Sequence, residues 1–348
     1  MGIKRMNKFL DEKQLIKSYN NLNEMIRNSK QSEYKVFNTR NKCYRLGIDT
    51  MLYAHKFKYS YNDIIYGFTN QILNFLNNRI LPIYIIDGVA PDEKSDLIKY
   101  RNDKKNKIDK KIENLKFLLQ NEIDQTKIRS LNNKIKNLNR SNIKITKDDI
   151  NNIISLLKKF NIPYVRAKGE ADALIGSLYE KKLIDSCLSE DMDILVFGCK
   201  KMIKFSNKKI YEYDLDHILD NLNLTLHQYI DMCIYFGCDY LRPVIKNASD
   251  EIYNSILNNT TNALLENNLQ SDNFTKYICK FNRAKDIFLN AKKIENTRYS
   301  AFQLKEQINF DDAIIFLKKH TNISNNKISD FEYNIQYING LISDNKFY

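Results

Sequence analysis

Residues 169–193 read Gly-Glu-Ala-Asp-Ala-Leu-Ile-Gly-Ser-Leu-Tyr-Glu-Lys-Lys-Leu-Ile-Asp-Ser-Cys-Leu-Ser-Glu-Asp-Met-Asp, with acids at both ends. Apolar side chains recur at helical spacing after Glu170, which predicts a helix that begins there. The short apolar run 184–188 predicts a buried strand, and it leads at once into the acidic run 190–193. Acids this close together repel one another unless they are solvated or bound to cations. The stretch is therefore either a solvated turn or a cation site.

Several other predicted strands also end at an acid. Strand candidates at 44–48, 81–86, 163–167, 184–188, 202–205 and 209–213 alternate with helical patterns. This alternation predicts an α/β fold with a mostly parallel sheet, in which ligands bind beyond the carboxyl ends of the strands. The acids that we expect to gather there are Asp49, Asp87, Glu170, Asp172, Asp191, Asp193 and Asp239. Such a cluster of oxygen ligands suits Mg²⁺ or Mn²⁺.

The positive charge of the chain is concentrated in one stretch. The 348 residues carry a formal net charge of +13, and the run 94–147 alone contains 16 Lys and Arg against 6 Asp and Glu. This run is poor in apolar residues and has no strand pattern, so we expect long helices there. A basic surface favours a polyanionic partner. Placed beside an acidic cluster, it suggests hydrolysis of phosphodiesters with two metal ions.

Composition argues against several other classes. No apolar run approaches the ~20 residues of a membrane span, and the first residues show no apolar signal region. The six cysteines form no Cys-x-x-Cys pair, which argues against zinc and against a disulfide framework. The four histidines also lack the spacing of a metal site. We therefore expect a soluble, intracellular protein with no membrane partner.

Five short motifs follow one another in a fixed order over roughly residues 1–240. They are Met1-Gly2-Ile3, the run from Ile85 to Lys94 (Ile-Ile-Asp-Gly-Val-Ala-Pro-Asp-Glu-Lys) with Arg101 beyond it, Gly169-Glu170-Ala171-Asp172-Ala173, the run from Ser189 to Gly198 (Ser-Glu-Asp-Met-Asp-Ile-Leu-Val-Phe-Gly), and Gly237-Cys238-Asp239-Tyr240. Together they resemble the motifs of the flap endonuclease branch of the XPG-type structure-specific 5′ nucleases. Compact, divergent relatives of this kind occur in large DNA viruses, and the resemblance implies such a virus as one source of this chain.

The resemblance implies a PIN-like 5′-nuclease fold, which is a central, mostly parallel sheet flanked by helices, with a helical arch and a helical C-terminal region. The expected nuclease core is 1–240, with an N-terminal part at 1–105, the arch at about 92–145 and an internal part at about 146–240. The remainder, 241–348, would be the helical C-terminal region with a diverged duplex-binding element.

The resemblance also implies roles for individual residues. Asp49, Asp87, Glu170 and Asp172 would lie nearer one Mg²⁺ ion, and Asp191, Asp193 and Asp239 nearer a second, with Mn²⁺ able to substitute. Lys94 and Arg101 would steer the scissile phosphate and act in catalysis. DNA would be contacted by Tyr53, which would stack on a base, and by Lys99, Lys104, Lys105, Arg242 and Lys246.

The chain departs from the family after Asp239. The family has a Gly-x-Gly hairpin there, which holds duplex DNA and a monovalent cation, whereas this chain has no glycine from 238 to 339. Its last residues, Asp-Asn-Lys-Phe-Tyr, do not match a sliding-clamp peptide.

Three functions follow from these patterns. The first is a metal-dependent 5′-flap endonuclease and 5′-exonuclease that acts on branched or flapped duplex DNA. We expect it to be a monomer that takes part in replication, repair or recombination, in the nucleus or at a site of viral DNA replication. The second is a junction-resolving nuclease of the same fold. The third is a DNA-binding or recombination factor that has lost catalysis, against which the seven acids count.

Overall fold

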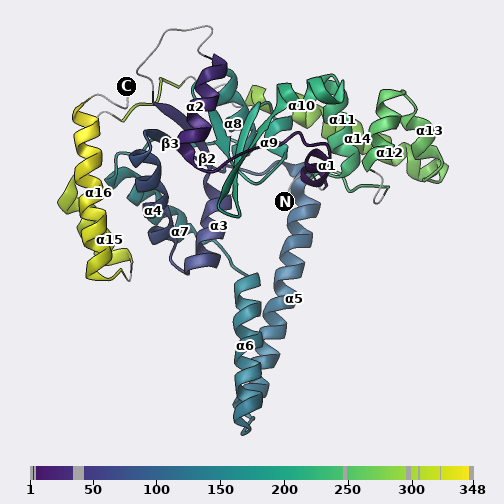
Figure 1. Ribbon diagram of the computed structural model, residues 1–348. Helices are drawn as coiled ribbons and strands as arrows, with labels where there is room; N and C mark the ends of the chain where they lie inside the picture. Colours follow the sequence, from purple (N-terminus) through teal and green to yellow (C-terminus); the bar gives the residue numbers. More distant parts are fainter. Residues whose placement is uncertain are drawn as a thin grey trace.

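The computed structural model describes residues 3, 5–33, 43–245, 249–294, 299–304, 306–321 and 323–344. Its centre is a single sheet of seven strands within these described residues (Figure 1). The strands are β1 (Lys17–Tyr19), β2 (Tyr44–Asp49), β3 (Ile80–Ile86), β4 (Tyr164–Arg166), β5 (Ser186–Leu188), β6 (Lys201–Ser206) and β7 (Lys209–Asp214).

The strand order is β1-β7-β6-β5-β2-β3-β4, and the five strands from β6 to β4 run parallel. Strands β7 and β1 complete one end in antiparallel pairs. The register aligns Ile48 of β2 with Tyr84 of β3 and with Leu188 of β5. Because the strands are parallel and aligned, the residues that follow β2, β3, β4 and β5 emerge along one edge of the sheet.

Burial explains why the central strands could be read from the sequence. Every residue of β3 is buried, and so are Leu46 and Ile48 of β2. Strands covered on both faces read as continuous apolar runs, which is the pattern that predicted them. Strand β1 was not predicted, because the sequence of residues 1–40 appeared helical and polar. It has only three residues and pairs at the edge with β7, so its own sequence carries little signal.

Helices cover both faces of the sheet (Figure 1). One face carries α3 (Thr50–Tyr61), α4 (Ile64–Asn77) and α7 (Lys147–Lys159). The other carries α8 (Ala171–Glu180) and α9 (Asp193–Val196), with α10 (Leu215–Leu222) and α11 (Leu226–Phe236) beyond them. The first helices are α1 (Met6–Glu12) and α2 (Leu22–Glu33). These two layers confirm the α/β class that the sequence predicted.

A helical hairpin projects from the body of the molecule (Figure 1). After the 3-10 turn η1 (Asp92–Lys94) it consists of α5 (Ser95–Gln120) and α6 (Gln125–Ser141), both inside the stretch 92–145 assigned to an arch. The 26 residues of α5 span about 39 Å at ~1.5 Å per residue. Ile112 and Ile135 are buried where the two helices pack, and the rest of the hairpin is largely exposed.

The last helices lie at opposite ends of the molecule (Figure 1). They are α12 (Ser249–Leu257), α13 (Thr261–Glu266), α14 (Ser271–Ile294), α15 (Phe310–His320) and α16 (Asn325–Ser343). Helix α14 packs on α8 and α11, whereas α15 and α16 pack on α7 and α4. The chain after residue 240 therefore supports both helical layers. Among the described helices, none combines the length and the apolar character that crossing a membrane requires.

Candidate active site at the carboxyl edge of the sheet

Strands β2 and β3 each deliver one carboxylate to the common edge. Asp49 is the last residue of β2 and also caps α3, because its Oδ1 accepts a hydrogen bond from the Leu52 amide at 3.1 Å. Asp87 follows β3, and its Oδ1 accepts from the Ala171 amide at 2.9 Å. Gly88 lets the segment after β3 lie close to the segment after β4, since a Cβ at Gly88 would lie 2.2 Å from the Ala167 carbonyl oxygen.

The turn from β4 into α8 delivers Glu170 and Asp172. Glu170 occupies the N-cap position of α8, but its side chain makes no capping hydrogen bond. Asp172 lies in the first turn, where the helix dipole favours an acid. The sequence prediction of a helix beginning near Glu170 is therefore confirmed, with α8 starting at Ala171.

The segment after β5 delivers Asp191 and Asp193. The Asp193 amide donates to Asp191 Oδ1 at 3.0 Å, and the Asp191 amide donates to the Ser189 hydroxyl at 3.1 Å. These bonds fold the acidic run into a tight turn. Asp193 is fully buried, and neither of its carboxylate oxygens has a hydrogen-bond partner. The turn is therefore not simply solvated, although Glu190 reaches outward to pair with Lys56 at 2.6 Å.

Asp239 reaches the site from beyond α11. Gly237 ends that helix with φ of +95°, and a side chain there would lie 2.4 Å from Pro243. The turn directs Asp239 toward two basic residues at the base of the hairpin. Its Oδ2 lies 3.3 Å from Lys94 Nζ and 3.2 Å from Arg101 Nη2. Lys94 also pairs with Glu170 Oε1, so one ammonium bridges two of the acids.

Burial and mutual repulsion shift the pKa values of acids in this cluster. Burial, with repulsion from Asp87, raises the pKa of Asp49 to about 7. Burial and neighbouring carboxylates also raise the pKa of Asp87, Asp172, Asp191 and Asp193. The neighbours that act on these groups include Glu170 and Asp239, so the seven predicted acids share one electrostatic environment.

Lys94 is the main source of opposing charge inside the cluster. Its side chain is 10% exposed. Burial acts to lower the pKa of Lys94, but the charges of Glu170, Asp172 and Asp239 outweigh it and the pKa is raised. The ammonium therefore stays charged among the carboxylates.

The donor set fits a divalent cation. Hard cations such as Mg²⁺ prefer carboxylate oxygens, and the unpartnered oxygens of buried Asp193 lack the donor or cation that such atoms normally have. As the side chains lie, no three His, Cys, Asp or Glu groups of the described chain converge closely enough to hold an ion. Lys94 occupies the space between Glu170 and Asp239.

Other predicted site residues fall in different surroundings. Tyr53 is 2% exposed and its ring packs against Phe57 at 5.6 Å. This corrects the expectation that Tyr53 stacks on a base, because its ring belongs to the core. Lys99 and Lys104 are exposed on α5 and Lys105 is half-buried there.

Of the two DNA contacts predicted after Asp239, Arg242 lies within the described residues. The Arg242 guanidinium lies over the Tyr100 ring of α5, 5.1 Å from its centroid. It therefore sits at the base of the hairpin, next to the acid cluster. Lys246 lies outside the described residues.

Two contacts at the site were not predicted from the sequence. The Tyr240 hydroxyl donates to Glu170 Oε2, although Tyr240 had been noted only as part of a motif. Arg283 of α14 donates to Glu93 Oε1 at 2.8 and 3.1 Å and so connects α14 to the start of the hairpin. The motif around Asp239 includes Tyr240 but does not indicate its partner, and no local sequence pattern marks the contact of Arg283.

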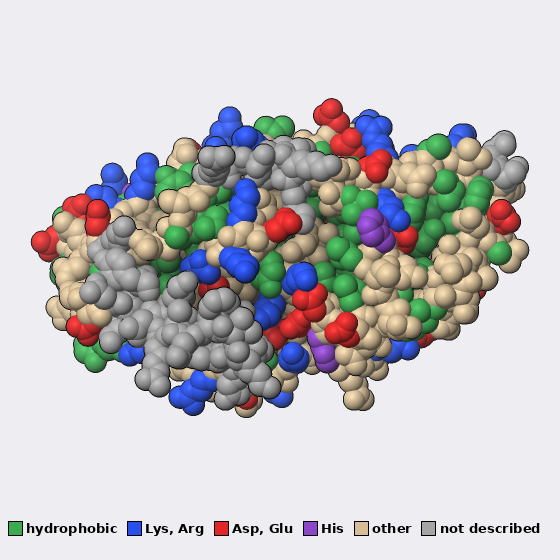
Figure 2. All heavy atoms as spheres, turned by 90° about the horizontal axis from the view of Figure 1, so that it is seen from above, with side chains coloured by type: hydrophobic (Ala, Val, Ile, Leu, Met, Phe, Trp, Pro, Cys, Tyr) green, Lys and Arg blue, Asp and Glu red, His purple; other side chains and the backbone are tan. Residues whose placement is uncertain are grey.

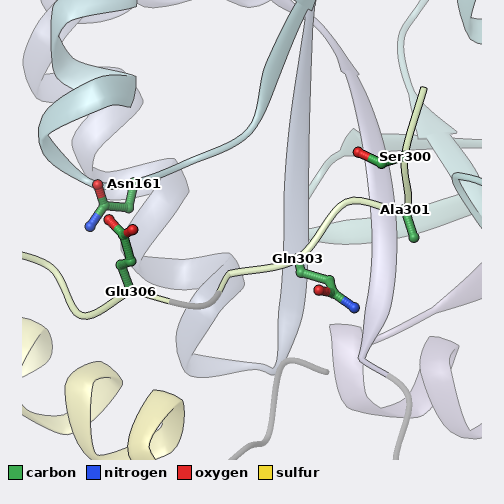
Figure 3. Close-up of a pocket in the computed structure, with 5 residues that line it drawn as sticks. All are labelled: Asn161, Ser300, Ala301, Gln303 and Glu306. Carbon is green, nitrogen blue, oxygen red and sulfur yellow. The ribbon is translucent and has the colours of Figure 1, made fainter. Parts of the chain in front are cut away.

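One hollow among the described residues lies away from this site. A hollow of about 540 Å³, lined by Asn161, Ser300, Ala301, Gln303 and Glu306, lies before the start of β4 and hence at the opposite edge of the sheet (Figure 3). The face seen from above, away from the hairpin tip, shows basic and acidic side chains intermixed (Figure 2). The basic stretch 94–147 therefore remains the main concentration of positive charge.

The sequence is similar to an XPG-type family region and to flap endonuclease 1 proteins. Residues 161–239, which carry five of the seven acids, match the XPG I-region. The chain is 30% identical over 259 residues to flap endonuclease 1 of Enterocytozoon bieneusi, a match that covers 69% of this chain and 65% of that protein. It is 31% identical over 206 residues to flap endonuclease 1 of Aedes aegypti, covering 57% and 51% of the two chains. The matches thus span about half to two thirds of these relatives.

Solved structures share the fold over nearly the whole chain. The catalytic core of Rad2 in complex with DNA substrate aligns with a TM-score of 0.65 at 18% identity, covering 96% of this chain and 99% of that one. Flap endonuclease-1 from Methanococcus jannaschii aligns with a TM-score of 0.60 at 19% identity, covering 87% and 94%. The motifs, the XPG I-region and the flap endonuclease 1 relatives agree with this fold: the chain belongs to the flap endonuclease branch of the XPG-type nuclease family.

Proposed function

We propose that this protein is a divalent-metal-dependent, structure-specific 5′ nuclease that hydrolyses phosphodiesters in flapped or branched DNA. The observation that carries the proposal is that acids from four strand ends and from the end of α11 share one electrostatic environment, in which Glu170 and Asp239 pair with basic residues at the base of the hairpin. Carboxylates alone would repel a phosphodiester. Metal ions and basic side chains beside them make the site attractive to one.

The residues that would hold two Mg²⁺ or Mn²⁺ ions are the seven acids, with Asp49, Asp87, Glu170 and Asp172 on one side and Asp191, Asp193 and Asp239 on the other. When bound, the ions would supply activation of a water molecule and stabilisation of the leaving oxygen. Such ions bind carboxylates in their ionised form. Because burial and neighbouring carboxylates raise the pKa of Asp193 and Asp172, ion binding would release protons from these groups.

Lys94 and Arg101 would act on the phosphate itself. Both now neutralise Asp239, and Lys94 also neutralises Glu170. Cations held by the acids would take over that neutralising role and release both side chains toward a phosphodiester. There the two positive charges would offset the charge that develops in the transition state. This exchange accounts for a buried lysine among proposed metal ligands.

The hairpin would hold the nucleic acid through its backbone. Lys99 and Lys104 are exposed along α5, and α6 carries basic residues and no acids. Contacts to phosphates release condensed counterions, so their contribution to affinity falls steeply with salt. Arg242 would add a contact beside the acid cluster, where its guanidinium lies over Tyr100.

A panel of labelled substrates tests the proposal. Purified protein would be incubated with a 5′ flap, a nick, a four-way junction and an intact duplex, each with Mg²⁺, Mn²⁺ or EDTA. We expect cleavage of the flap near its base with either ion and none in EDTA. Preference for the junction, with symmetric cuts, would instead favour a junction-resolving nuclease. Binding without cleavage of any substrate would contradict a catalytic role.

A further inference from the structure

Tyr240 follows Asp239 and connects two groups of the proposed site. Its hydroxyl donates a hydrogen bond to Glu170 Oε2, and its ring lies beneath Lys94 Nζ, 5.1 Å from the ring centroid. Lys94 in turn pairs with Glu170 Oε1. We propose that Tyr240 is a positioning residue that fixes the Glu170 carboxylate and the Lys94 ammonium relative to each other. The kinetic part of this inference rests on the proposed nuclease function.

The local helix does not orient Glu170 by itself. Although Glu170 occupies the N-cap position of α8, its side chain makes no capping hydrogen bond. Its Oε2 is engaged by Tyr240 and its Oε1 by Lys94. A hydrogen bond to an ionised carboxylate is about twice as strong as a neutral one. The plane of this carboxylate is therefore set by partners from the hairpin base and from the segment after α11.

The ring of Tyr240 is itself held in place by the helical layer behind it. It packs edge-on against Phe288 of α14, with centroids 5.3 Å apart and planes at 80°. Phe288 is 1% exposed and contacts Phe197, directly after α9, at 5.0 Å. Since α9 begins at Asp193, one row of aromatic rings connects α14, the two acid-bearing segments and Tyr240. This row gives the hydroxyl a fixed direction, which a positioning role requires.

Two substitutions separate the hydroxyl from the ring. Tyr240→Phe keeps the ring beneath Lys94 and against Phe288 but removes the donor to Glu170. We expect the affinity for Mn²⁺, measured by electron paramagnetic resonance without DNA, to weaken about 10-fold, the scale of one lost hydrogen bond to a charged group. Tyr240→Leu also removes the ring, and we expect the single-turnover cleavage rate at saturating Mg²⁺ to fall a further ~3-fold through loss of the cation–π contact with Lys94.

Tyr253→Phe is the matched control. The Tyr253 hydroxyl donates to the Leu222 carbonyl oxygen at 2.9 Å, and no described acid of the cluster contacts it. This variant loses a comparable tyrosine hydrogen bond, so equal melting temperatures of the two Phe variants would show that Tyr240→Phe is folded. We expect Tyr253→Phe to bind Mn²⁺ and cleave DNA like the wild type.

Unchanged Mn²⁺ affinity together with an unchanged cleavage rate in Tyr240→Phe would overturn the inference. A rise in the Kd for DNA without a change in Mn²⁺ affinity would overturn it too, because it would make Tyr240 a substrate contact. If the wild type binds Mn²⁺ but cleaves no DNA, the proposed function fails, yet the Mn²⁺ comparison still decides the role of Tyr240.

Discussion

The Lys94 ammonium lies 3.3 Å from Asp239 Oδ2. This ion pair joins the base of the hairpin to the segment that follows α11. The same ammonium contacts Glu170 at the start of α8. Arg101, two helical turns further along the hairpin, approaches Asp239 from the same side. The position of the hairpin and the arrangement of the acids are therefore coupled, because moving one changes the charge balance of the other.

We expect Lys94→Ala to slow single-turnover cleavage by about 10²–10³-fold while the Kd for DNA changes only a few-fold. The reason is that a preorganised charge aimed at the reacting group acts mainly in the transition state. Lys104→Ala, at an exposed position of α5, should show the opposite pattern, with weaker binding, a smaller dependence of affinity on salt and an unchanged rate. Equal losses of rate and affinity in Lys94→Ala would make Lys94 an ordinary phosphate contact.

Asp193→Asn should stabilise the protein in EDTA. Asp193 is fully buried without hydrogen-bond partners, and where it is ionised, replacing the charged carboxylate by a neutral amide should be worth about 1–3 kcal/mol. Differential scanning fluorimetry should show a rise in Tm of a few degrees. Asp216→Asn, which removes an exposed acid paired with Lys200, is the control and should leave Tm nearly unchanged.

The stabilising effect should depend on pH. Burial raises the pKa of Asp193 well above its ordinary value. An acid whose folded-state pKa is raised contributes full stability below its unfolded pKa of about 3.9, and that contribution is lost as pH rises through the folded pKa. The gain in Tm from Asp193→Asn should therefore be larger at pH 8 than at pH 5. A gain that shrinks as pH rises would contradict the buried charge.

Two helical glycines should respond in opposite ways to alanine. In Gly176→Ala the new Cβ would lie 2.0 Å from the Phe197 carbonyl oxygen, where α8 meets the end of α9. We expect a loss of stability above 1 kcal/mol, typical of overpacking. Outside the nearby backbone of α16, a Cβ at Gly340 would have no described heavy atom within 4 Å, so Gly340→Ala should stabilise by about 0.5–1 kcal/mol. Denaturant unfolding would measure both, and similar changes would show that α8 and α9 are not closely packed.

The segment after Asp239 should make cleavage insensitive to the identity of the monovalent cation. Residues 241–245 contain no glycine, and Pro243 removes one amide donor. Binding of the downstream duplex should then depend on side chains such as Arg242 and, by prediction, Lys246. Cleavage rates in KCl and NaCl at matched ionic strength would be compared while the downstream duplex is lengthened. A strong preference for K⁺ with a sharp length threshold would contradict this.

The sequence predicted most of this site because its signals are local. An apolar run followed by an acid marks both a buried strand and the edge where it ends, as at Ile86 and Asp87. Thr146 and Thr225 carry local signals of the same kind, because each forms a capping box with the residue three positions later, at the start of α7 and of α11. Tyr53 shows the limit of such signals, because an aromatic residue after a strand can face the core or a ligand with the same local pattern.

What the sequence could not predict depends on contacts between distant segments. Strand β1 exists through pairing with β7, and Arg283 meets Glu93 only because α14 packs beside α8. The arrangement of the C-terminal helices on both layers has the same origin. The expected viral source and the expected monomer stay predictions.

The most direct test of the account is cleavage of a labelled 5′ flap by Asp191→Ala. Asp191 accepts a hydrogen bond from the Asp193 amide and shares the field of Asp172 and Asp239. We predict Mg²⁺-dependent cleavage by the wild type, no detectable cleavage by the variant, and a Kd for the flap that is unchanged or lower because a negative charge near the phosphate is gone. Cleavage by the purified variant at the wild-type rate would contradict the proposal that these carboxylates hold the metal ions.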